Sequence, residues 1–224
     1  MIPKRSGWYL LLVVLLVLLS PSVSFAQEAG DELGKVSELD KVSLSDKNKF
    51  PPLELRVLSV EGDPLKLRPD DDQWSPVKKG EVLPEKTRVV TERDETIQME
   101  IPGVSLIEVD TSTEIVLDKL LRKQETRIRR SGLLMNAEKK TINEVELETP
   151  AGEVSNSLRD NNEMESDYKL KTPNAVAGVR GTSFSCAVSE GSTNCSVLDG
   201  EVTLSRRDDP SISTLLGAGL SGAF

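Results

Sequence analysis

The sequence predicts an all-β fold, either a β-sandwich or a short β-solenoid, and three observations support this prediction. From Leu53 onward, apolar and polar residues alternate with period two in short runs. Turn-forming residues separate the runs, as at Glu61–Pro64, Pro69–Asp72 and Pro102–Gly103. Long stretches with helical spacing are absent. We therefore expect about ten short strands around one core.

The expected strands follow one another closely in the first half of the chain. They lie at Leu55–Ser59, Leu65–Leu67, Val89–Val90, Ile97–Ile101, Leu106–Val109 and Ile115–Leu117. Asp118–Arg130, which follows them, is rich in Lys, Arg and Leu, and it fits either a strand extension or a short helix. Ser155–Asp167 is polar and acidic, which predicts an exposed loop.

A short segment occurs twice, once on either side of this loop. Glu146–Pro150 resembles Lys169–Pro173, and each copy ends at its proline. The spacing between the two prolines is within the range of a β-solenoid coil, but two similar strand ends before proline would give the same pattern.

The segment 1–26 has the pattern of a cleaved secretory signal peptide. Lys4 and Arg5 precede an unbroken Leu and Val run, Leu10–Leu19, and small residues stand at Ser24 and Ala26. The alternative, a membrane anchor, needs about 20 apolar residues, more than this run provides. We therefore expect cleavage after Ala26, a periplasmic or secreted protein, and no transmembrane helix in the mature chain.

The remaining chain divides into three predicted parts. Residues 27–52 form an acidic linker, residues 53–205 form the β domain, and residues 206–224 form a C-terminal tail or a closing strand.

Composition excludes several classes of function. The 224 residues contain no histidine, which rules out Ser-His-Asp and Cys-His catalysis and histidine-ligated metals. The formal net charge of −9 argues against nucleic-acid binding. Two cysteines are too few for an iron–sulfur cluster or a four-cysteine zinc site. We expect no cofactor, no metal site and no catalytic residues.

The two cysteines lie on either side of a predicted hairpin turn. If Glu190-Gly191 is the turn, Phe184 faces Val197 and Cys186 faces Cys195, and all four side chains share the apolar face. Directly opposed strand residues are close enough for a disulfide, and an exported protein meets oxidising conditions. A disulfide is favoured over the alternative, two free buried thiols.

The segment Lys171–Phe184 closely resembles the signature of the FecR domain, the periplasmic domain of iron-dicitrate-type transmembrane regulators. The signature reads TP-x-A-x-x-x-VRGT-x-F, and the matching residues are Thr172, Pro173, Ala175, Val179, Arg180, Gly181, Thr182 and Phe184. Val197–Val202 resembles the family's V-x-x-G-x-V strand through Gly200, and an upstream segment with Trp74 and Gly80 resembles its W-x-x-V-x-x-G-x-x-L. The resemblance extends from Leu53 to Ser205 and implies a FecR-type β domain.

Within this signature, Arg180 stands between two glycines. We expect its guanidinium to reach a carboxylate or strand carbonyls as a structural clamp, with ligand binding as the alternative.

The resemblance also directs the functional expectation. Iron-type regulators carry a cytoplasmic anti-sigma region, whereas here only residues 1–7 precede the apolar run. We expect a free-standing, non-enzymatic envelope protein that binds another envelope protein or a cell-wall glycan. The alternative is a periplasmic regulatory or sensing component acting through a separate membrane signalling partner. A carbohydrate-active enzyme is the weakest hypothesis, because the sequence offers no nucleophile–base pair.

Overall fold

The computed structural model describes residues 52–131, 134–159 and 164–224, which fall within the second of two compact units, Ser43–Phe224. The described residues form fourteen strands and no helix, so the all-β prediction is confirmed. None of them forms a helix that could cross a membrane. The signal-peptide prediction, and most of the linker, lie outside these residues.

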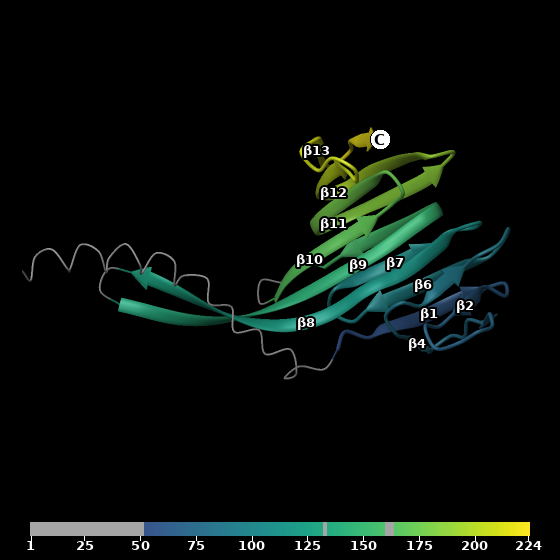
Figure 1. The fold of residues 1–224 in the computed structure, drawn as a ribbon, viewed down its shortest axis with the longest axis horizontal. Coiled ribbons are helices and arrows are strands. Elements are labelled where there is room, and N and C mark those ends of the chain that lie inside the picture. The colour runs from purple at the N-terminus through teal and green to yellow at the C-terminus, as the bar shows by residue number, and fades with distance from the viewer. Residues whose placement is uncertain (1–51, 132–133, 160–163) are drawn as a thin grey trace, which may run out of the picture. The chain divides into compact units, whose positions relative to one another are not determined.

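The strands vary widely in length (Figure 1). They are β1 (Leu55–Glu61), β2 (Leu65–Leu67), β3 (Ser75–Pro76), β4 (Val82–Leu83), β5 (Arg88–Val90), β6 (Thr96–Ile101), β7 (Ser105–Val109), β8 (Glu114–Ser131), β9 (Leu134–Leu158), β10 (Met164–Lys171), β11 (Ala175–Ser189), β12 (Ser192–Arg206), β13 (Ser213–Gly217) and β14 (Ser221–Ala223).

One mixed sheet contains all of these strands, and it has two halves that share long strands. In one half the order is β4-β1-β6-β7-β9-β11-β12-β14, and in the other it is β3-β2-β5-β8-β9-β10-β11-β12-β13. Strands β9, β11 and β12 therefore run through both halves. The buried side chains form a single cluster to which both halves contribute, for example Met99 and Leu117. Because buried residues of both halves belong to one cluster, the two halves share a single core.

Each shared strand turns a corner between the halves, and its buried residues change parity there. In β11 the buried positions are odd up to Val179 and even from Thr182, and in β12 they are odd up to Val197 and even from Val202. One extra residue at each corner keeps the same face of the strand toward the core, as a β-bulge does. Glycines with positive φ occupy these corners: Gly152 (+90°), Gly181 (+54°) and Gly200 (+85°).

The strands predicted between Leu55 and Leu117 are confirmed, and Asp118–Arg130 continues β8 as a strand, not a helix. The predicted exposed loop at 155–167 is wrong for most of its length. Ser155–Leu158 ends β9 and Met164 begins β10, because backbone pairing with neighbouring strands outweighs the polar composition.

The repeated segment has a structural counterpart. Strands β9 and β10 are parallel, and Glu146, Leu147 and Glu148 pair with Lys169, Leu170 and Lys171. The register of this pairing equals the offset at which the two copies recur in the sequence. The copies therefore lie side by side, as successive coils of a solenoid do.

Candidate functional site

The Val-Arg-Gly-Thr motif forms the corner of β11. The hydroxyl of Thr182 is buried and lies 2.8 Å from the carbonyl of Arg180 and 2.9 Å from that of Glu201, and it accepts a hydrogen bond from the Glu201 amide at 3.2 Å. Gly200 of β12 packs against it, because a Cβ there would lie 2.7 Å from the Thr182 hydroxyl and 2.8 Å from the Gly181 carbonyl. The motif therefore joins the two corners.

The Thr-Pro-x-Ala part of the motif holds the turn between β10 and β11. Buried Thr172 accepts a hydrogen bond from the Ala175 amide at 3.0 Å and one from the Thr193 hydroxyl at 2.7 Å. Pro173 is exposed, whereas Ala175 and Phe184 belong to the core. These residues stabilise the fold, and their polar groups do not line a hollow that could hold a ligand.

The hairpin between β11 and β12 has the predicted register. Glu190 and Gly191 form the turn with φ values of +49° and +77°, as a type I′ turn requires. Cys186 pairs with Cys195, their Cα atoms are 4.1 Å apart, and the structure contains the disulfide between them. Both cysteines are fully buried.

The upstream motif lies near the other end of the sheet. Trp74 precedes β3 and is partly exposed, with the guanidinium of Arg88 located 5.6 Å from its ring centroid. This distance is typical of a cation–π contact. Gly80, with φ of +81°, donates its amide hydrogen to the carbonyl of Val57 at 2.8 Å, which holds the turn before β4 against β1.

Arg180 differs from the expected clamp. Its side chain is exposed and makes no hydrogen bond or ion pair within the described ranges, because the strand alternation places it on the outer face of the sheet. It lines a hollow of about 470 Å³ together with Asp167, Glu201, Thr203 and Leu215. Gly178 and Gly200 lie in the same hollow, where they contribute no side chains. The hollow thus contains one guanidinium and two carboxylates.

The C-terminal edge of the sheet beside this hollow is apolar. Four large apolar side chains are exposed there, Leu198 by 81%, Leu215 by 61%, Leu220 by 55% and Ile212 by 42%. Leu198 lies in β12, and the other three lie in or next to β13 and the turn to β14. These side chains are spread along β12: Ile212 lies beside Arg206, Leu215 beside Thr203, and Leu220 beside Val197, next to Leu198. Exposed apolar side chains along one edge are a feature of protein–protein contact sites.

The two edges of the sheet are not alike. At the opposite edge, β3 and β4 have two residues each, and Pro76 and Pro84 lie in or directly after them. Very short strands and prolines prevent further strand pairing. Strand β13 has five residues and neither proline nor lysine, so this edge has no such protection.

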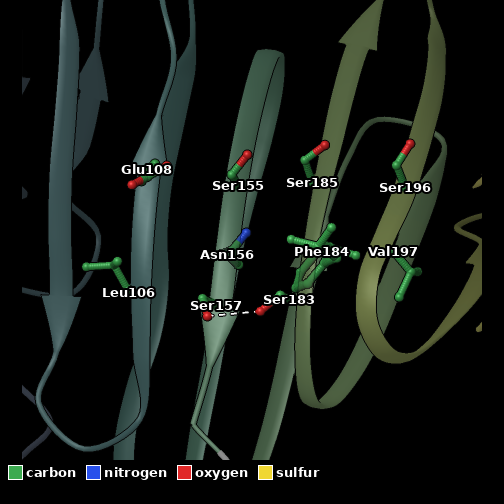
Figure 2. A pocket seen from close by; sticks show the side chains of 11 residues that line it. Leu106, Glu108, Ser155, Asn156, Ser157, Ser183, Phe184, Ser185, Ser196 and Val197 are labelled. Carbon is green, nitrogen blue, oxygen red and sulfur yellow. Dashed lines mark hydrogen bonds between the residues drawn. The ribbon is translucent and has the colours of Figure 1, made fainter. Parts of the chain in front are cut away.

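A second hollow, of about 480 Å³, crosses the outer face of β7, β9, β11 and β12 (Figure 2). Glu108, Ser155, Ser185 and Ser196 pair successively across these strands, and the hydroxyls of Ser157 and Ser183 lie 3.0 Å apart. Glu108 is the one ionisable group that lines it. This hollow can form hydrogen bonds, but it holds no acid–base pair for catalysis.

The described part of the chain offers surfaces for binding. Within it, no group of three or more carboxylates and thiols is placed to hold a metal ion. The sequence analysis did not predict the C-terminal apolar edge. Strand alternation directs Leu198 and Leu215 outward because Val197 and Leu216 are buried, and the burial of these two residues follows from strand pairing that the local sequence does not show.

These features define an all-β domain whose signature residues stabilise its turns and corners. Residues 87–203 match the model of the family described as FecR protein. The chain belongs to the FecR family, whose members are generally non-enzymatic.

Similarity to solved structures is limited. Two crystal structures of "a putative anti-sigma factor from Parabacteroides distasonis ATCC 8503" align with 14% and 15% identity and TM-scores of 0.42 and 0.41. In both cases 61% of this chain is covered, and the chain spans about half of the other protein, 53%. Among curated proteins, none matches the chain.

Proposed function

We propose that the protein is an exported, non-enzymatic FecR-domain protein that binds another envelope protein along its C-terminal edge. The observation that carries this proposal is the row of exposed large apolar side chains along β12 and β13, from Ile212 through Leu215 to Leu220 and Leu198. Apolar surface left in water is costly, and a partner that covers it gains binding energy. Family membership supports a non-enzymatic role.

Two further observations support export. The segment 1–26 has the composition of a signal peptide that ends at Ala26. A buried disulfide between Cys186 and Cys195 is typical of oxidising compartments, such as the periplasm or the outside of the cell.

The polar hollow in Figure 2 favours a second candidate, the binding of a cell-wall glycan. Its serine hydroxyls can donate and accept hydrogen bonds with sugar hydroxyls. No exposed aromatic side chain lines it for stacking against a sugar ring, so we rank the glycan below a protein partner. A regulatory role through a separate membrane protein would use the same apolar edge.

Site-specific cross-linking in intact cells tests the leading proposal. A photo-reactive amino acid replaces Leu215, and in the matched control it replaces Leu65, an exposed leucine of β2. We expect one protein adduct of defined mass at position 215, none at position 65, and loss of the adduct when Leu198 and Leu220 are both changed to serine. Absence of an adduct at position 215 in exported, folded protein would refute the proposal. Adducts with soluble wall fragments alone would favour the glycan.

A further inference from the structure

The hydrogen-bonding groups of β13 alternate between β12 and the free edge. The amide of Arg206 donates to the carbonyl of Ile212 at 3.0 Å, and Ser205 pairs with Ser213. In an antiparallel ladder the directly hydrogen-bonded pairs recur at every second residue. The groups of Thr214 therefore face β12, and the amides and carbonyls of Ser213 and Leu215 point outward along the free edge.

The side chains beside this edge form short rows across the outer face. Leu215 lies next to Thr203, and Gly217 lies next to Glu201, which in turn lies next to Arg180. No atom lies within 4 Å of the position that a Cβ on Gly217 would occupy. A side chain from a strand added outside β13 could therefore pass over Gly217 and reach the Glu201 carboxylate.

The charges around this path are mainly acidic. Glu201 is exposed and makes no ion pair within the described ranges. Asp167, on the far side of the hollow, lies 3.1 Å from Lys169. Arg180 is the single cation that lines the hollow. Strand β13 carries no charged side chain, so a second copy paired through its own β13 would leave the Glu201 carboxylate without a cation, whereas a basic segment would complement it.

We propose that the partner binds by strand addition, with an extended segment that pairs with Ser213 and Leu215. This segment carries an apolar residue opposite Leu215 and, two residues away on the same face, a Lys or Arg opposite Gly217 that reaches Glu201. The backbone groups of β13 give the pairing, and the apolar and basic side chains give the selectivity. This inference rests on the proposed function, because it names the partner chemistry of the same edge.

Two synthetic hexapeptides test the proposal on the purified protein. Both peptides contain valine. Two residues from the valine, one peptide carries lysine and the other carries glutamate. By fluorescence anisotropy we expect the lysine peptide to bind about fivefold more tightly, the upper range for a partly exposed ion pair. Its binding should slow hydrogen exchange at the Ser213 and Leu215 amides but not at Thr214, whose amide already bonds within the sheet.

Two variants test separately the charge of Glu201 and the access of a side chain to Glu201 over Gly217. Glu201→Gln should bring the affinity ratio close to one. Gly217→Val should have the same effect by closing the path, and it should fold normally because Gly217 has an ordinary φ and open space around it. Circular dichroism and melting temperature check that both variants are folded.

Three outcomes would overturn the inference: equal affinities for the two peptides, exchange protection elsewhere, or protection of the same amides by self-association without peptide. If any of these outcomes occurs while cross-linking at position 215 still captures a protein, the inference of strand addition by a basic segment is wrong and the proposed function stands. If the peptides behave as expected but no adduct forms at position 215 in cells, the edge binds such segments and the proposed function fails.

Discussion

Replacing Gly200 with alanine tests the role of the corner in the family signature. Gly200 has a φ of +85°, a region that costs a residue with a Cβ about 1–2 kcal/mol. The new Cβ would also lie 2.7 Å from the Thr182 hydroxyl and 2.8 Å from the Gly181 carbonyl, so Thr182 must move. Weakening its hydrogen bonds to β12 costs about another 1 kcal/mol. We expect a total loss of about 2–3 kcal/mol.

Thermal unfolding followed by circular dichroism measures this loss. In a domain of this size each kcal/mol lowers the melting temperature by about 2–4 °C, so Gly200→Ala should lower it by about 4–12 °C. Gly219→Ala is the matched control, because Gly219 has a similar φ of +78° but no atom within 4 Å of a Cβ. The control should lose only the backbone strain, about 1–2 kcal/mol. Equal losses for the two variants would refute the packing argument at the corner.

Other predictions concern the disulfide and two ionisable groups. Reduction of the bond between Cys186 and Cys195, which are nine residues apart, should lower the stability by at most about 3 kcal/mol. Labelling of two thiols in unreduced, unfolded protein would contradict the bond. Burial acts to raise the pKa of Glu81, but hydrogen bonds from Lys66, the Lys78 amide and Arg68 outweigh it and hold the pKa below its usual value of 4.5. The carboxylate therefore stabilises the fold fully above pH 4.5, and this contribution is lost as the pH falls through the lowered pKa. Glu81→Gln should flatten the acid side of a plot of melting temperature against pH, and a curve parallel to that of the wild type would contradict this. Burial raises the pKa of Tyr168 well above its usual value of 10.0, so its contribution to stability is present below pH 10 and is lost at higher pH. In protein that begins at Gln27, where Tyr168 is the one tyrosine, ultraviolet titration should show no ionisation before unfolding, and a normal titration in folded protein would count against burial.

Much of the fold could be predicted because local patterns determine it. Period-two alternation located the strands between Leu55 and Leu117, and the Glu190-Gly191 turn set the register of the cysteine hairpin. The expectation of about ten short strands failed because β9, β11 and β12 continue through their corners. At Gly181 and Gly200 the alternation changes parity, and a sequence pattern alone does not distinguish a corner from the end of a strand.

The candidate binding edge was harder to predict. The signature drew attention to Arg180 and its neighbours, most of which stabilise turns and corners. Leu215 and Leu216 have similar sequence contexts, yet Leu216 is buried and Leu215 is exposed. Their difference depends on the pairing of β13 with β12, a long-range contact that composition does not encode.

The unequal edges of the sheet limit what the protein can assemble into. Growth into a filament requires each molecule to present one joining edge and one receiving edge. Here β3 and β4 are too short and too rich in proline to receive a strand, so these two edge strands are closed to strand pairing. Strand addition at β13 of one molecule therefore cannot continue through β3 or β4 of the next molecule, and a segment bound at β13 does not extend the sheet into a filament through that edge.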